Sequence, residues 1–345
     1  MKQKSFPVLL IALSVAIFTG GCSGSDGEGG AIEAVASGDY GTAVSAADAV
    51  IAEGADKMTC RAKGIALMGQ GQYAEAIQAF DQALSCSNGI VEAADVDISY
   101  YLAVSEFKNG DAAAALSTVE AITALKPKDD GAYFLKGKIE LASGDKDAAL
   151  GDFDRTVELA ADNYDRYVGI YEELHARGYD AEAASYLEKA MTAGNKLSDY
   201  NKGVLEYYLG AYTDARGDLE NARKSGKSEN LILYLGRTYE ALGDPAYAVT
   251  IYEEYIRENP TAGAVYEELA TCRMNQGDYE GALSTIEAGM NAGDGEGKKG
   301  MMFDRAVAYE MLYDFENAAK YMEEYLAAYP DDEVAKRENL FLSTR

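Results

Sequence analysis

The amino-acid sequence predicts an all-α protein made of about nine stacked helical hairpins. The first observation is a turn position that recurs with steps of 33, 39, 34, 34, 32, 33, 34 and 36 residues. Glycine occupies this position eight times and tyrosine once, at Gly38, Gly71, Gly110, Gly144, Gly178, Gly210, Gly243, Gly277 and Tyr313. A period near 34 residues is typical of helix–turn–helix units that each contact their neighbours along a stack.

The second helix of each hairpin is predicted from two further positions. Five residues after every turn position stands an alanine: Ala43, Ala76, Ala115, Ala149, Ala183, Ala215, Ala248, Ala282 and Ala318. Four residues later the side chain is always apolar: Ala47, Phe80, Val119, Phe153, Leu187, Leu219, Tyr252, Ile286 and Met322. A separation of four residues places both positions on one helical face. This face therefore offers a small residue where helices approach closely and a larger one beside it.

The first helix and the turn are predicted in the same way. Seven residues before the turn the residue is small in Gly64, Ala103, Gly137, Gly203, Gly236, Ala270 and Ala306, with Tyr171 as the exception. The turn glycine ends this helix, because a left-handed backbone is cheap only without a β-carbon. An aspartate often follows and can cap the next helix, as in Asp39, Asp111, Asp145, Asp244 and Asp278.

This combination resembles the tetratricopeptide repeat family, a 34-residue helix–turn–helix with Gly-x-Tyr-x-x-Ala at its turn and a proline that closes the second helix. Pro127, Pro260 and Pro330 each fall 17 residues after their turn positions. The resemblance covers residues 31–345 and implies a right-handed α-α superhelix. We expect a truncated first hairpin that begins at Ala31, and a capping helix at residues 332–341. Residues 87–97 and 293–297 are expected to be loops or slight breaks.

Residues 1–21 have the layout of a bacterial export signal. Lys2 and Lys4 precede an apolar run, Val8 to Phe18, that is too short for a transmembrane helix. Small residues and Cys22 follow, which resembles a lipoprotein signal, whose cysteine receives a diacylglycerol group. The alternative is ordinary secretion with an unmodified Cys22. Residues 22–30 are predicted to be a flexible tether, and the expected location is the extracytoplasmic face of a bacterial membrane.

The chain is strongly acidic, with a formal net charge of −27. Such a charge argues against nucleic-acid binding, because phosphate contacts need lysine and arginine. The acids are spread over predicted helix surfaces. We interpret them mainly as solvated outer faces, with attraction to basic partners or cations as the alternative.

The cysteines leave two interpretations open. Cys60 is expected near the start of the first helix of its hairpin and Cys86 near the end of the second. Antiparallel helices bring these ends together, so a Cys60–Cys86 disulfide is feasible outside the cytoplasm. The alternative is two small buried thiols. Cys272 is expected to pack in the core.

Catalytic chemistry has little to draw on. His175 is the only histidine, so histidine-rich metal sites and Ser/His/Asp arrangements that need a second histidine gain no support. No phosphate-cradling glycine loop is indicated either. We therefore expect no enzyme activity, cofactor, metal or small-molecule substrate.

The resemblance also implies a concave groove lined by first-helix residues at set distances before each turn. The candidate groove residues are Arg61, Tyr100, Phe107, Phe134, Lys138, Tyr200, Tyr207, Tyr208, Leu233 and Arg237. An aromatic trough with a few charges suits a protein or peptide partner. The alternative is that many of these tyrosines pack against neighbouring helices.

Three functions follow, in order of preference. The first is a lipid-anchored extracytoplasmic adaptor that mediates protein–protein interactions at the bacterial cell envelope. The second is an envelope assembly factor of the pilus-biogenesis or outer-membrane-assembly lipoprotein type. The third, an enzyme or ligand receptor, is disfavoured because no site for it is found.

Overall fold

The computed structural model describes residues 26–36, 38–87, 89–193, 197–292, 295, 297–330 and 332–345. This part of the chain forms nineteen α-helices and contains no strand. The predicted all-α stack of helical hairpins is therefore confirmed. The described residues form two compact units, of which one ends at Tyr186 and the other begins at Leu187.

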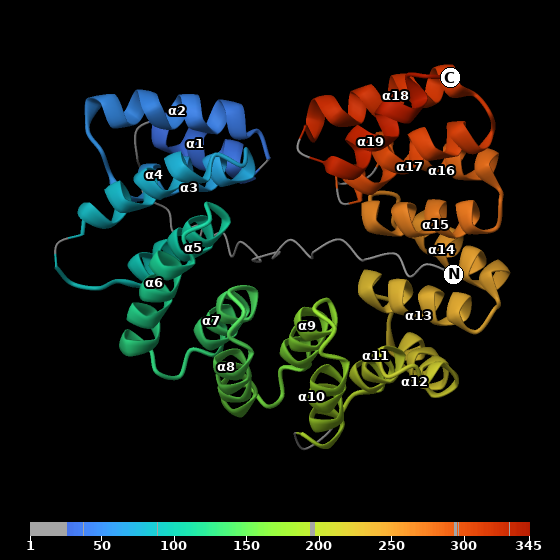
Figure 1. The fold of residues 1–345 in the computed structure, drawn as a ribbon, viewed down its shortest axis with the longest axis horizontal. Coiled ribbons are helices and arrows are strands. Elements are labelled where there is room, and N and C mark those ends of the chain that lie inside the picture. The colour runs from blue at the N-terminus through green and yellow to red at the C-terminus, as the bar shows by residue number, and fades with distance from the viewer. Residues whose placement is uncertain are drawn as a thin grey trace. The chain divides into compact units, whose positions relative to one another are not determined.

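The first unit holds four complete hairpins and the helix that opens the fifth (Figure 1). Its helices are α1 (Asp26–Ala36), α2 (Tyr40–Glu53), α3 (Lys57–Gly69), α4 (Tyr73–Ser85), α5 (Ala93–Lys108), α6 (Ala112–Leu125), α7 (Asp130–Ala142), α8 (Lys146–Leu159) and α9 (Tyr164–His175). The boundary between the units falls inside the next helix, α10 (Asp180–Thr192).

The second unit continues the alternation of first and second helices. Its helices are α11 (Asp199–Tyr208), α12 (Tyr212–Ser225), α13 (Glu229–Ala241), α14 (Pro245–Glu258), α15 (Gly263–Asn275), α16 (Tyr279–Ala292), α17 (Lys298–Met311), α18 (Phe315–Ala328) and α19 (Glu333–Leu342). In both units the odd-numbered helices up to α17 open hairpins, and the even-numbered helices close them. The last helix, α19, is the predicted capping helix, and its Ala335 and Leu342 are buried against the final hairpin.

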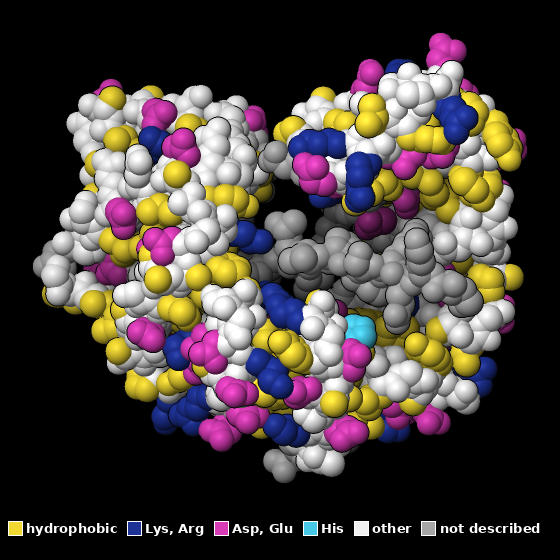
Figure 2. Space-filling model, in the orientation of Figure 1, with side chains coloured by type: hydrophobic (Ala, Val, Ile, Leu, Met, Phe, Trp, Pro, Cys, Tyr) yellow, Lys and Arg dark blue, Asp and Glu magenta, His cyan; other side chains and the backbone are white. Residues whose placement is uncertain are grey.

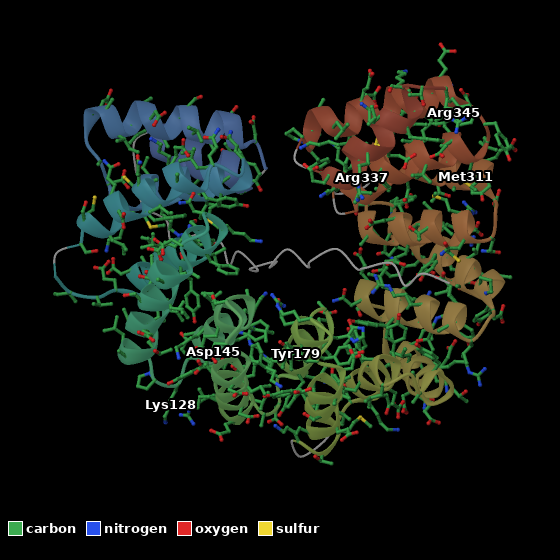
Figure 3. All side chains as sticks on the ribbon, in the orientation of Figure 1. Lys128, Asp145, Tyr179, Met311, Arg337 and Arg345 are labelled. Carbon is green, nitrogen blue, oxygen red and sulfur yellow. The ribbon has the colours of Figure 1, made fainter. Side chains whose placement is uncertain are left out.

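The turns have the predicted backbone geometry. All eight turn glycines have a positive φ, between 74° and 91°. Tyr313, with a φ of 62°, is the one non-glycine residue with a positive φ among the described residues, and it is 82% exposed. The predicted aspartate caps are also present. For example, Asp145 (labelled in Figure 3) accepts a hydrogen bond from the Ala148 backbone N–H at 3.1 Å.

The positions predicted for the core are all in the core. The nine alanines that follow the turns, and the nine apolar residues four positions later, are each 0% exposed. Full burial at equivalent positions of every hairpin shows that one packing scheme is repeated along the chain.

Within a hairpin, a small residue of the first helix packs against a larger side chain of the second helix, so the two side chains share one space. A β-carbon added at Gly64 would lie 2.4 Å from the Phe80 ring, and one at Gly137 would lie 2.7 Å from the Phe153 ring. The same holds at Gly236, where Tyr252 is 2.2 Å from the added atom. Where the first helix carries alanine instead, the second helix carries no ring: the pairs are Ala103 with Val119, Ala270 with Ile286 and Ala306 with Met322.

The predicted start of the first helix is wrong by five residues. Helix α1 begins at Asp26, so residues 26–30 of the predicted tether lie in a helix. Ala31 and Ala34 are buried against the next hairpin. Once packing fixes the helical turn that holds Ala31 and Ala34, extending the helix toward its N-terminus adds one backbone hydrogen bond for each ordered residue.

The loop predicted within residues 87–97 is confirmed but is shorter than expected, because α5 begins at Ala93. Glu92 and Asp95 explain the early start, since each side chain bonds to the other's backbone N–H in a capping box.

Gly137→Ala should destabilise the protein by about 1–2 kcal/mol, because the added methyl group meets the Phe153 ring. The cost should be less than half as large in a Phe153→Val background, where the pair becomes the equivalent of Ala103 with Val119. Urea denaturation of the four proteins of this double-mutant cycle measures both numbers.

Gly151→Ala is the matched control. Gly151 lies in the same hairpin, in α8, and an added β-carbon would meet nothing within 4 Å. This change should stabilise the protein by roughly 0.5–1 kcal/mol through helix propensity. Equal effects of Gly137→Ala and Gly151→Ala would contradict this sharing of space between the two helices.

Candidate functional site: the face of the first helices

In each unit several first helices contact the first helix of the next hairpin. Helix α3 contacts α1 and α5, and α7 contacts α9 in the first unit. In the second unit α13 contacts both α11 and α15, and α15 contacts α17. We call the surface of these helices the first-helix face. The ten candidate groove residues all lie on its helices: α3, α5, α7, α11 and α13.

In the first unit the basic candidates form ion pairs between neighbouring hairpins. Arg61 of α3 donates to Asp97 of α5, with 2.6 Å between Nε and Oδ2. Lys138 of α7 lies 2.7 Å from the Glu173 carboxylate of α9. A comparable hydrogen bond runs from the Tyr100 hydroxyl of α5 to Asp129, which caps α7, at 2.6 Å. Burial, with the Asp129 carboxylate, raises the pKa of Tyr100, so its phenol is neutral and acts as the donor.

The second unit repeats this arrangement. Arg237 of α13 donates to Glu268 of α15 through Nε, at 3.0 Å, and also through a terminal nitrogen. Their side chains are 29% and 23% exposed. Although burial acts against its charge, the Glu268 carboxylate raises the pKa of Arg237. The basic candidates therefore hold neighbouring first helices together.

The acidic partners in these pairs, Asp97, Glu173 and Glu268, were not among the residues predicted from the sequence. Asp97 follows Arg61 by 36 residues, and Glu268 follows Arg237 by 31. A search for opposite charges about one repeat apart would have found them. The same spacing joins Arg166 to Asp130, 36 residues apart, at 2.7 Å.

The aromatic candidates gather mainly in the second unit. Tyr200, Tyr207 and Tyr208 of α11 meet Tyr234 of α13, and Tyr207 also meets Tyr212 of α12. We call these five residues the tyrosine cluster. Ring centroids of its contacting pairs are 5.5–6.5 Å apart with steeply inclined planes, an arrangement that favours edge-to-face attraction. The hydroxyl oxygens of Tyr208 and Tyr234 lie 3.1 Å apart.

All five rings of the tyrosine cluster are half-buried. Burial raises the pKa of Tyr207 to about 12, so its phenol is neutral at physiological pH. Arg237 lies over the Tyr234 ring at 5.8 Å. The cluster thus presents neutral aromatic surface beside a charge that Glu268 already neutralises. Tyr212 and Tyr234 were not among the predicted groove residues.

The remaining candidates differ in their availability. Phe134 is half-buried, 6.0 Å from Phe153, with Lys138 and Arg166 over its ring at 5.4 and 5.1 Å. Phe107 is half-buried against the core of its hairpin. Leu233 is only 8% exposed. Its side chain therefore offers little surface to a ligand, and its place in the groove stays a prediction.

The cysteines match neither predicted state completely. Cys60 and Cys86 are unbonded thiols in the structure, and Cys60 is buried whereas Cys86 is exposed. Cys86 caps the end of α4 at the surface, and its Sγ lies 3.3 Å from the Gln82 carbonyl oxygen. Burial raises the pKa of Cys60 to about 11. Cys272 is buried, as predicted, and Cys22 lies outside the described residues.

His175 takes part in a small surface cluster. Its ring is stacked on Tyr171 at 5.3 Å, and Nδ1 lies 2.7 Å from the Asp180 carboxylate. Within the described ranges no group of three or more His, Cys, Asp and Glu side chains is arranged to hold a metal. None of the described helices combines the length and apolar character that crossing a bilayer requires.

The fold and the first-helix face define a protein-interaction scaffold built from repeated helical hairpins. One family model described as tetratricopeptide repeat matches residues 29–89, 61–130, 100–165, 200–260 and 233–295. A second model of the same description matches residues 301–332. These matches cover more than half of the sequence. The chain belongs to the tetratricopeptide repeat family.

Individual proteins are only distantly similar. Protein FlbA of Caulobacter vibrioides is 29% identical over 214 residues, which are 60% of this chain and 30% of the relative's length. A tetratricopeptide repeat protein from Parabacteroides merdae is 17% identical, with a TM-score of 0.46 over 84% of this chain and 99% of that one. The type IV pilus biogenesis factor PilW is 17% identical, with a TM-score of 0.40 over 70% and 97%.

Proposed function

We propose that this protein is a lipid-anchored adaptor that binds proteins outside the cytoplasm, at the bacterial cell envelope. The observation that carries the binding part is the tyrosine cluster on a tetratricopeptide repeat scaffold. Half-buried tyrosines are rigid and amphipathic, so they supply contact area at a low cost in conformational entropy. They stand on helices whose positions are held by ion pairs.

The charges near the cluster favour a partner segment with apolar or basic side chains. Arg237, the arginine over its Tyr234 ring, is paired with Glu268, so it is poorly placed to anchor an acidic partner. The net charge of −27 acts in the same direction. On the side shown in Figure 2, acidic and basic side chains are interspersed.

The membrane part of the proposal rests on the sequence before Asp26. A basic start, an apolar run and small residues before Cys22 are the features of a lipoprotein signal. A lipid on Cys22 would place the first hairpin within a few residues of a membrane surface, since helix α1 begins at Asp26.

A crosslinking experiment tests the binding face. A photoreactive phenylalanine analogue at Tyr208 of the full-length protein should capture a protein partner in intact bacterial cells. The same analogue at Tyr247 should not, because Tyr247 is a 40% exposed tyrosine on the second helix α14. With the analogue kept at Tyr208, Tyr200→Ala with Tyr234→Ala should weaken partner capture about tenfold or more, since central aromatic residues dominate interfaces.

Equal crosslinking at Tyr208 and Tyr247 would contradict the proposed face. The identity of the captured proteins separates an adaptor from an assembly factor: several unrelated partners favour an adaptor, and one stoichiometric machine favours an assembly factor.

Metabolic labelling with a radioactive fatty acid tests the anchor. The wild-type protein should incorporate the label and sediment with membranes, whereas Cys22→Ala should lose both properties because the acceptor thiol is gone. Cys86→Ala removes an exposed thiol from the hairpins and serves as the control. Persistence of the label in Cys22→Ala would refute lipidation at this residue.

A further inference from the structure

Two hairpins, one in each unit, contain the same group of three charged side chains, of which the glutamate is buried. In the first, Lys136 and Glu140 of α7 face Asp152 of α8. In the second, Lys202 and Glu206 of α11 face Asp218 of α12. We call these the carboxyl triads. The two glutamates stand four residues before their turn glycines and the two aspartates eight residues after them, so the triads occupy equivalent repeat positions.

The geometry of the two triads is nearly identical. Lys136 Nζ lies 3.1 Å from Glu140 and 2.7 Å from Asp152. Lys202 Nζ lies 3.2 Å from Glu206 and 2.6 Å from Asp218. One ammonium group therefore bridges two carboxyl groups in each hairpin. If both carboxyl groups were ionised, each triad would carry one uncompensated negative charge.

The glutamates are the buried members of the triads. The Glu140 and Glu206 side chains are 9% and 8% exposed. In each of them Oε1 faces the lysine, whereas Oε2 is buried and has no hydrogen-bond partner. An ionised oxygen without a partner is costly in such a place, but a protonated one can donate to the neighbouring aspartate. The same orphaned atom in both hairpins indicates a proton position.

We propose that each carboxyl triad binds one proton between its glutamate and its aspartate, and that losing this proton as the pH rises loosens the first helix of the hairpin from the second. The helices concerned are α7 and α11, which also carry Phe134, Lys138 and the tyrosines of α11 on the first-helix face. Release of the protons thus changes the packing of the two helices that carry that face, whether or not a partner is bound.

The pKa shifts agree with this assignment. Burial and the Asp152 carboxyl outweigh Lys136 and raise the pKa of Glu140 to about 7. Burial and Asp218 outweigh Lys202 and raise the pKa of Glu206. Helix α7 also packs against α6 and α9, and α11 against α13, but no charged group of these helices is among the largest influences.

The direction of the pH effect follows from these shifts. A carboxyl whose pKa is higher in the folded than in the unfolded state holds its proton more tightly when folded. Its contribution to stability is therefore present below the unfolded pKa of 4.5 and is lost as the pH rises through the folded pKa near 7. For Glu140 alone the unfolding equilibrium constant should rise on the order of a hundredfold between pH 4.5 and pH 8.

The test is a side-chain carboxyl titration of the full-length protein by NMR, with carbon-13 glutamate, alongside urea denaturation at pH 5 and pH 8. Among the glutamate signals whose midpoints lie above 4.5, we expect one to disappear in Glu140→Gln and another to disappear in Glu206→Gln. The double variant should lose much of the fall in stability between the two pH values, because glutamine imitates the protonated form. Glu120→Gln, on the exposed surface of α6, is the control and should keep the wild-type fall.

Other carboxyl groups with a raised pKa contribute to that fall in every variant; they are Asp81, Glu106, Glu240 and Glu310. Their contribution to the fall in stability is the same in Glu120→Gln, so it cancels when the double variant is compared with this control. Titration of Glu140 and Glu206 near 4.5 would overturn the proposal, as would a double variant that is as pH-dependent as the control. The NMR titration of the wild-type protein decides the matter even if the variants do not fold.

Discussion

A helical hairpin cannot bury both of its apolar faces, so each hairpin of this protein depends on the next one for its stability. Inside a hairpin the helices approach closely because a small first-helix residue receives a large side chain from the second helix, as Gly236 receives Tyr252. Between hairpins the first helices meet along one face, where polar pairs such as Arg61 with Asp97 join them. The turn glycines, in the left-handed region of φ, join the two helices of each hairpin.

This organisation determines what the first-helix face can bind. Its arginines and lysines are used between hairpins, so they stiffen the stack and contribute little free charge to a ligand. The half-buried rings of the tyrosine cluster remain as contact surface, and their hydroxyl groups can donate or accept hydrogen bonds. The carboxyl triads lie on the opposite side of α7 and α11, between the helices of a hairpin, and make the support of this face sensitive to pH.

Most of the fold could be predicted from the sequence, because the turn glycines and the buried alanines recur at one spacing and each has a local physical reason. The candidate site was less accessible. A position in the repeat places Leu233 on the correct helix, but whether its side chain is covered depends on the neighbouring hairpin. Arg237 lies on the helix that the repeat predicts, α13, whereas its partner Glu268 lies one repeat away. The start of α1 was missed because glycine-rich composition outweighed the effect of packing at Ala31.

Native-state hydrogen exchange of the full-length protein, followed by mass spectrometry, tests the dependence of each hairpin on its neighbours most directly. Arg237→Met, which removes the ion pair with Glu268 between α13 and α15, should reduce protection in α13–α16 and leave α3–α6 unchanged. Lys227→Met, which removes a pair with Glu258 whose side chains are 37% and 58% exposed, should have little effect. A loss confined to α13, or an equal loss throughout the chain, would contradict coupling between adjacent hairpins.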